Sequence, residues 1–149
     1  MYKHILIATD GSELASKAVA EGLGLASACK ARATVLTVSA PFSSLGDAQH
    51  MFAGLPEAMR RQAINYLYEE AKTTLKQAQN AAKSAGVDCA VKSVEDAHPF
   101  QAITMVAEQD NCDLIVMASH GRSGASRLLL GSETTKVLTH SKIPVLVCR

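Results

Sequence analysis

The hydrophobic positions along the chain fall into two alternating patterns. Short runs in which nearly every residue is apolar are typical of strands that are buried on both faces of a sheet. Between these runs, apolar residues recur every three or four positions, as they do along a helix with one buried face. The predicted strands are the segments 3–9, 33–38, 87–94, 113–118 and 143–148. The predicted helices are the segments 12–26, 59–86, 98–110 and 132–140.

The second of these helices is long for a small domain. Its apolar stripe continues from Met59 to Ala82 and stops at Gly86, a residue type that commonly follows a helix end. At about 1.5 Å per residue this helix would span about 40 Å, so we expect its first turns to project beyond the sheet or to break. The preceding segment, 41–56, predicts an irregular loop that is either functional or flexible. For residues 41–66, a lid and a dimer contact are both compatible with the pattern.

Strands and helices alternate strictly along the chain, which predicts an α/β fold. Apolar strands joined by helical crossovers favour a doubly wound, five-stranded parallel sheet with helices on both faces, a Rossmann-like arrangement. Such a sheet binds ligands at the carboxyl ends of its strands, where the strand order reverses. No internal repeat is visible, and we expect residues 1–149 to form a single domain.

Composition and charge narrow the classes of function. Apolar residues make up 48% and charged residues 19% of the chain, as in globular proteins. Aromatic residues make up only 4%, which argues against stacking platforms for single-stranded nucleic acid. The formal net charge of +1 provides no general attraction to nucleic acid or to an anionic membrane.

The first residues and the cysteines predict a cytoplasmic protein. The opening apolar run has four residues, fewer than the ~7–15 of a secretory signal. No apolar stretch approaches the ~20 residues that would span a bilayer. The cysteines show no CxxC spacing, so we expect buried free thiols at Cys29, Cys89, Cys112 and Cys148.

The connection between the strand 113–118 and the helix 132–140 carries the most distinctive chemistry. Counted through Ser132, it holds three Gly, four Ser and two Arg residues. Glycine lets the backbone approach a phosphate closely, and a helix start offers free N–H groups and the positive end of the helix dipole. Arg122 and Arg127 add positive charge. On these residues alone, a phosphate site and an ordinary Gly-rich turn before a Ser-capped helix both remain open.

The spacing in this connection resembles that of a known family. His120-Gly121, a nine-residue spacer and Gly131-Ser132 resemble the G-x2-G-x9-G-[ST] nucleotide loop of the universal stress protein family. The segment 5–12 looks like the first strand and turn of that family, and the segment 141–147 is similar to its closing strand. The resemblance covers essentially the whole chain and implies the Rossmann-like fold of adenine nucleotide alpha hydrolase-like proteins.

What the resemblance implies is a site for an adenine nucleotide, either ATP or AMP. Asp10 would reach the ribose, or a Mg²⁺ or Mn²⁺ ion bound with the nucleotide, while Val38 and Met117 would flank the adenine. The phosphates would be held through backbone N–H and hydroxyl groups by Gly121, Gly131, Ser132 and Thr134. The full set of residues expected at the site is Ala8, Thr9, Asp10, Val38, Met117, Ala118, Ser119, His120, Gly121, Arg122, Gly131, Ser132, Glu133 and Thr134.

Two of these residues stand out within the loop. Ala118 takes the place of the first glycine of the family motif. Alanine keeps the backbone N–H, so we expect the exchange to be tolerated if the φ angle of Ala118 is negative. Glu133 would stand close to the phosphates, where it either caps a helix or shares a divalent ion with the nucleotide.

Three classes of function follow from these residues and the resemblance. The first is a regulatory module of the stress response that binds ATP or AMP without strong catalysis, because no catalytic base is evident. The second is a slow ATPase or nucleotide hydrolase that uses Asp10, a metal ion and His120. The third is a nucleotide-free dimeric interaction module.

His98 and His140 lie at a predicted helix start and a predicted helix end, where local capping or interaction with the helix dipole is enough to explain them. The histidines are scattered along the chain without paired spacing, so they do not predict a metal site built by protein alone.

The last predicted strand indicates a partner. A sheet edge formed by Val145, Leu146 and Val147 would expose unpaired backbone groups and apolar side chains. Pairing with a second copy of the chain would cover both. The family resemblance also implies a homodimer built in this way.

Overall fold

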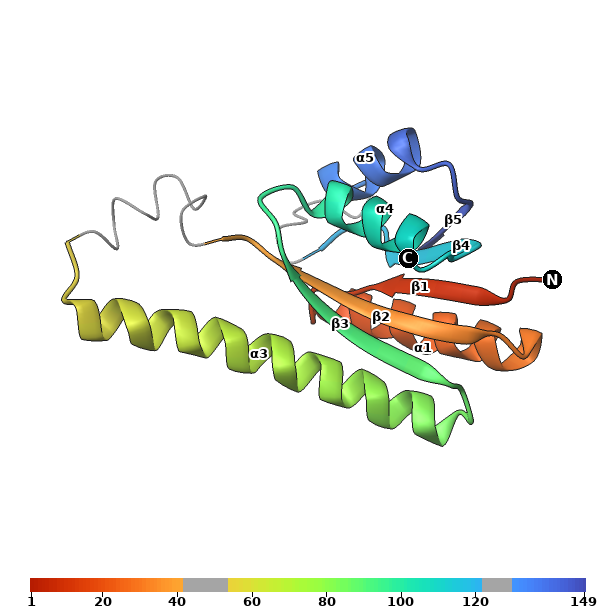
Figure 1. The fold of residues 1–149 in the computed structure, drawn as a ribbon, viewed down its shortest axis with the longest axis horizontal. Coiled ribbons are helices and arrows are strands. Elements are labelled where there is room, and N and C mark those ends of the chain that lie inside the picture. Colours follow the sequence, from red (N-terminus) through yellow and green to blue (C-terminus); the bar gives the residue numbers. More distant parts are fainter. Residues whose placement is uncertain (42–53, 122–129) are drawn as a thin grey trace.

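The fold is a parallel sheet with two layers of helices, as expected for a doubly wound α/β protein (Figure 1). The structure is a computed structural model, and it describes residues 1–41, 54–121 and 130–149. The strand order is β3-β2-β1-β4-β5, and all neighbouring strands are parallel. The strands are β1 (His4–Ala8), β2 (Arg32–Ser39), β3 (Cys89–Glu95), β4 (Leu114–Ala118) and β5 (Val145–Cys148). The predicted fold class is confirmed.

The helices divide between the two faces of the sheet. They are α1 (Glu13–Cys29), α3 (Glu57–Ser84), α4 (Pro99–Gln109) and α5 (Ser132–His140). Figure 1 shows α1 and α3 below the sheet and α4 and α5 above it. Side chains alternate between the two faces along each strand, so Ile5 and Ile7 join the core under α1 while Leu6 joins the core under α4 and α5.

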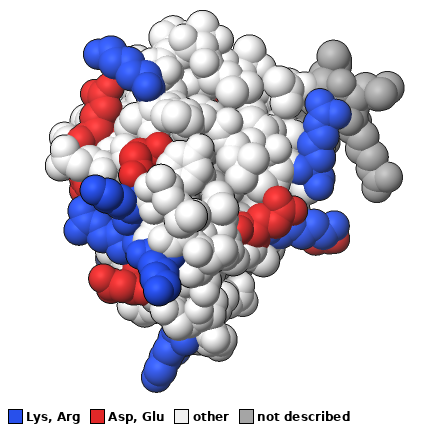
Figure 2. Space-filling view, turned by 90° about the vertical axis from the view of Figure 1, so that its right-hand side faces the viewer, with Lys and Arg blue, Asp and Glu red and all other residues white. Residues whose placement is uncertain are grey.

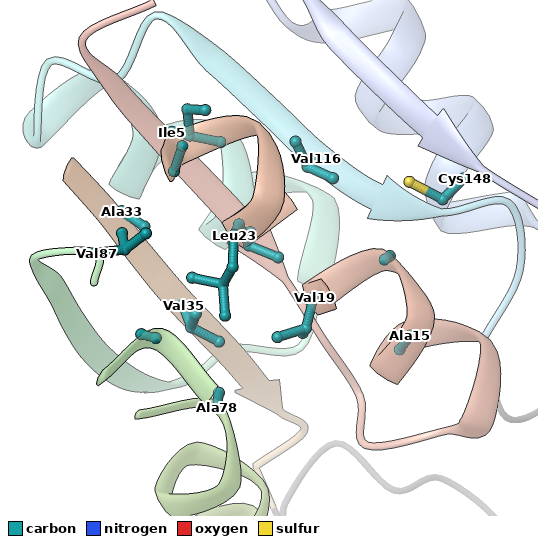
Figure 3. Packing of buried hydrophobic residues seen from close by; sticks show 14 of the residues in the cluster. Ile5, Ala15, Val19, Leu23, Ala33, Val35, Ala78, Val87, Val116 and Cys148 are labelled. Atoms are coloured by element: carbon teal, nitrogen blue, oxygen red, sulfur yellow. The ribbon is translucent and has the colours of Figure 1, made fainter. Parts of the chain in front are cut away.

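The core on the α1 side is built from small and medium aliphatic side chains. Figure 3 shows Val19 and Leu23 of α1 in the same buried cluster as Val35 and Val116 of the sheet. Each fully buried aliphatic side chain contributes about 1.5–3 kcal/mol through loss of apolar surface to water. The sequence places Ser12 before this helix, and its Oγ accepts a hydrogen bond from the backbone N–H of Ala15 at 3.2 Å, which caps α1 as predicted.

The long helix α3 projects beyond the sheet and does not break. It is continuous over 28 residues, and its buried residues are Leu75, Ala78 and Ala82, all in its second half. In the first half, Met59 and Leu67 remain 55% and 49% exposed. Figure 1 shows this half extending past the ends of the strands. Gly86 follows the helix with a φ of 65°, in agreement with the predicted helix end.

The prediction of uniformly buried strands is wrong at the two sheet edges. Along β3 every residue is half-buried or exposed, and β5 contains only one buried residue, Cys148. An edge strand has a neighbour on one side only, and each of these strands is covered incompletely by helices. β1 and β4, in the interior of the sheet, are buried throughout.

The cysteines agree with the expectation only in part. All four are free thiols, but Cys29 and Cys89 are half-buried, while Cys112 and Cys148 are buried. Burial raises the pKa of Cys148 to about 12 and that of Cys112 to about 11. These two thiols are therefore protonated and unreactive at neutral pH.

The surface mixes charges of both signs. On the face shown in Figure 2, lysine and arginine side chains are interspersed with aspartate and glutamate side chains. This distribution fits the formal net charge of +1. Across the described residues, no helix has both the length and the apolar character needed to cross a membrane.

Candidate functional site

A cavity of about 400 Å³ opens at the carboxyl ends of the central strands. It lies where the chain switches direction in the sheet, because the connection after β1 leads to β2 on one side and the connection after β4 leads to β5 on the other. Its volume falls within the ~300–1,000 Å³ typical of small-molecule sites. The residues that line it are Ala8, Thr9, Asp10, Ala15, Leu36, Val38, Pro99, Ile103, Met117, Ala118, His120, Gly121, Gly131, Ser132, Glu133 and Thr134.

The structure brings nearly all the predicted site residues to this cavity. The exceptions are Ser119, which lies beside it, and Arg122, which lies outside the described residues. The sequence prediction missed Ala15, Leu36, Pro99 and Ile103. Leu36 lies in the predicted strand 33–38 and Ile103 in the predicted helix 98–110, but the apolar pattern of an element does not reveal which of its side chains border a cavity.

One part of the cavity is an apolar surface. Leu36 and Val38 come from β2, Met117 from β4 and Ile103 from α4. Leu36, Met117 and Ile103 belong to the buried cluster on the α4 side of the sheet, which fixes their positions. Because these side chains offer no polar atoms, this surface suits a flat apolar group.

The turn after β1 places a carboxylate at the polar part of the cavity. Thr9 is buried, and its N–H donates to the carbonyl of Leu36 at 2.9 Å. Asp10 Oδ1 accepts a hydrogen bond from the N–H of Ser12 at 3.0 Å. A Cβ atom placed on Gly121 would lie only 2.5 Å from Asp10 Oδ2, so a larger residue there would displace the Asp10 carboxylate from its position.

The start of α5 forms the opposite wall. Gly131 precedes the helix and donates its N–H to the carbonyl of Ser119 at 2.8 Å. A Cβ atom on Gly131 would lie 3.1 Å from the Cα of His120, closer than side chains normally pack. No described side chain caps this helix end, and the residues of its first turn line the cavity, so the positive end of the helix dipole lies beside it.

The structure revises the role expected for Thr134. Its hydroxyl is buried and donates to the carbonyl of Ala118 at 3.0 Å, which ties α5 to the end of β4. The hydroxyl proton is thus used within the protein. A phosphate contact by Thr134 would be left to its backbone N–H.

Ala118 fits its place in the motif without backbone strain. It is the last residue of β4 and has a negative φ, since the described non-glycine residues with positive φ are Lys30 and Asn111. Its side chain packs in the core on the α1 side of the sheet. The condition for tolerating alanine at this position is therefore met.

Glu133 caps a helix, but not its own. Its Oε2 accepts a hydrogen bond from the backbone N–H of Phe100 at 3.0 Å, in the first turn of α4. Its Oε1 forms an ion pair with Lys136 Nζ at 2.7 Å. The side chain of His98 makes no capping hydrogen bond to α4. His140 does make a local contact, from Nδ1 to the carbonyl of Lys136 at 2.8 Å.

The remaining predicted residues support the loop. Ser119 is buried, donates its N–H to the carbonyl of Cys148 and contacts His120 Nδ1 through its Oγ at 3.1 Å. His120 lines the cavity with this contact in place. Within the described part of the chain, no group of three or more His, Cys, Asp or Glu residues could hold a metal ion by itself.

Comparison with known proteins identifies the family. The model of the universal stress protein family matches residues 1–149. The chain belongs to the universal stress protein family. A curated relative, universal stress protein MJ0531 of Methanocaldococcus jannaschii, is 32% identical over 152 aligned positions that cover 100% of this chain and 83% of the relative.

Solved structures of this family share the fold. Protein MJ0577 of the same archaeon superposes with a TM-score of 0.76 at 30% identity, covering 99% of this chain and 96% of that one. A universal stress protein in complex with cAMP superposes with a TM-score of 0.73 at 26% identity, covering 99% of this chain and 97% of that one. The doubly wound architecture of this universal stress protein is thus shared with its relatives over essentially the whole length.

Proposed function

We propose that this universal stress protein binds an adenine nucleotide, ATP or AMP, in the cavity at the ends of β1 and β4, and acts as a regulatory module of the stress response. The observation that carries the proposal is the pairing of two surfaces in one cavity. An apolar surface around Val38 and Met117 suits the adenine, and the glycine-lined start of α5 suits the phosphates. The complex of a related family member with cAMP supports an adenine-bearing ligand.

The proposal assigns each part of the site a role. Asp10 faces the ribose, or a Mg²⁺ or Mn²⁺ ion that arrives with the nucleotide. Gly121, Gly131 and Ser132 offer backbone N–H groups to the phosphates. Binding without strong catalysis requires none of these groups to act as a base, and His120 serves by contacting Ser119.

Two further features belong to the same proposal. The chain works as one domain over residues 1–149 and forms a homodimer through the edge strand β5, where Leu146 is 39% exposed. The four free cysteines support a reducing compartment, and we therefore place the protein in the cytoplasm.

The proposal is tested by denaturing the purified protein and identifying the released nucleotide by mass spectrometry, together with calorimetric titration of ATP and AMP. Gly121→Val is the test variant, because its Cβ would lie 2.5 Å from Asp10 Oδ2 and its methyl groups would fill the phosphate end. Gly54→Val is the matched control, because a Cβ there meets nothing within 4 Å.

We expect nucleotide to bind to the wild type and the control and to be lost, by at least about tenfold in affinity, from Gly121→Val. Equal nucleotide content in the three proteins would contradict the assignment of the site. Steady phosphate release from ATP that disappears in Asp10→Ala would instead favour a slow ATPase. The absence of any binding to the wild type would favour an interaction module without a ligand.

A further inference from the structure

Two carboxylates line the cavity proposed for the nucleotide. Among the described residues that line it, the formally charged side chains are Asp10 and Glu133. Asp10 lies against Gly121, and Glu133 follows Ser132 in the first turn of α5. The backbone N–H groups of this turn attract a phosphate, while the carboxylate of Glu133 repels each negative charge that the phosphate carries.

Glu133 is held in this position from two sides. Its carboxylate accepts the N–H of Phe100 at 3.0 Å and pairs with Lys136 Nζ at 2.7 Å. Lys136 is itself placed over the ring of Phe100, with Nζ 5.5 Å from the ring centroid. Rotation of the carboxylate away from an incoming anion would break both of its contacts and leave the start of α4 without this cap. The negative charge therefore stays beside the cavity when a ligand enters.

We propose that Glu133 is a specificity-determining residue that makes this site prefer adenine nucleotides with few negative charges, AMP and cyclic AMP, over ATP. The inference rests on the proposed function, since it concerns the ligand of that same cavity. Cyclic AMP carries roughly one negative charge, AMP roughly two and ATP roughly four at neutral pH. Each added charge increases the repulsion from the fixed carboxylate. The side chain of Glu133 is 35% exposed, so solvent screens the repulsion without removing it.

The test measures dissociation constants for cyclic AMP, AMP and ATP by calorimetry, in EDTA so that each nucleotide keeps its own charge. Glu133→Gln removes the charge but retains an oxygen that can accept the N–H of Phe100. We expect the ratio of the dissociation constant for ATP to that for AMP to fall about tenfold in this variant, because one negative charge is removed close to the added phosphates. The constant for cyclic AMP should change least.

Two control variants separate charge from structure. Glu108→Gln removes the same charge from an exposed position near the end of α4, far from the start of that helix, and should leave the ratio unchanged. Glu133→Asp keeps the charge but shortens the reach to Phe100, so it should retain the discrimination against ATP. Circular dichroism and thermal melting confirm that each variant is folded.

The outcomes distinguish this inference from the proposed function. If all three nucleotides bind and Glu133→Gln shifts their affinities equally or not at all, the charge selection is wrong while the nucleotide site stands. If Glu133→Gln keeps the discrimination while Glu133→Asp loses it, the helix cap and not the charge is responsible. If no nucleotide binds to the wild type, both the proposed function and this inference fail.

Discussion

His4 is a titratable side chain enclosed at the start of β1. It is buried, and its ring contacts the carbonyl of Asp110 through Nδ1 at 3.0 Å and Thr34 Oγ1 through Nε2 at 2.9 Å. A neutral ring with its proton on Nδ1 satisfies both contacts, donating to the carbonyl and accepting from the hydroxyl. Burial lowers the pKa of His4 below its usual value of 6.5. The folded protein thus favours the neutral ring.

This environment predicts a loss of stability in mild acid. Below about pH 6.5 the unfolded chain protonates His4 while the folded chain resists it, so the free energy of unfolding falls as the pH decreases. In His4→Asn, which keeps a donor near the Nδ1 position, we expect lower stability and a weaker dependence on pH between about 5 and 7. Urea titrations at several pH values measure the free energy of unfolding and its dependence on pH. His98→Asn, at an exposed histidine, serves as the control, and an unchanged pH dependence in His4→Asn would refute the assignment.

At the scale of single elements, α1 contains two glycines in very different surroundings. Gly22 is buried against the sheet, where an added Cβ would lie 2.8 Å from Ile7 Cδ1 and 3.4 Å from Val116 Cγ1. An added Cβ on Gly24 would meet nothing within 4 Å. The first glycine therefore sets how closely α1 approaches β1 and β4, and the second has no packing role.

The two glycines provide a matched pair for measuring this packing. Gly24→Ala should raise the free energy of unfolding by about 1 kcal/mol, the difference in helix propensity between the two residues. Gly22→Ala gains the same propensity but overpacks the core, at a cost of about 1–3 kcal/mol, so it should be less stable than Gly24→Ala. Chemical denaturation followed by circular dichroism compares them. Equal stabilisation by both substitutions would show that α1 can move away from the sheet without loss.

The elements and the polar part of the site could be predicted because their signals are local. The apolar period marks strands and helices, and Asp10, Gly121 and Gly131 stand in short motifs with fixed spacing. The contact of Glu133 with the N–H of Phe100 could not be predicted, because it depends on how α4 and α5 pack across 33 positions of sequence. The exposure of β3 was missed for a related reason, since strand order in the sheet decides which strands become edges.

At the scale of the whole molecule, the edge strand β5 determines how two copies would meet. Under the proposed dimer, its exposed Leu146 lies in the contact between the copies, and a lysine there would both remove apolar surface and introduce repulsion. We expect Leu146→Lys to shift the protein from dimer to monomer, by at least about tenfold in dissociation constant. Light scattering coupled to gel filtration gives the mass directly. Met105→Lys, at a residue of α4 that is 44% exposed, is the control, and a variant Leu146→Lys that remains dimeric would place the contact elsewhere.

The projecting half of α3 has a consequence for cooperativity. Its first turns contribute none of the buried residues of the helix, whereas the later turns anchor Leu75, Ala78 and Ala82 in the core. Opening those first turns would expose little new apolar surface, so they can fray and re-form while the sheet stays closed. The molecule thus has two levels of stability along a single helix, a tight one in the later turns that share the core with the sheet and a loose one in the first turns.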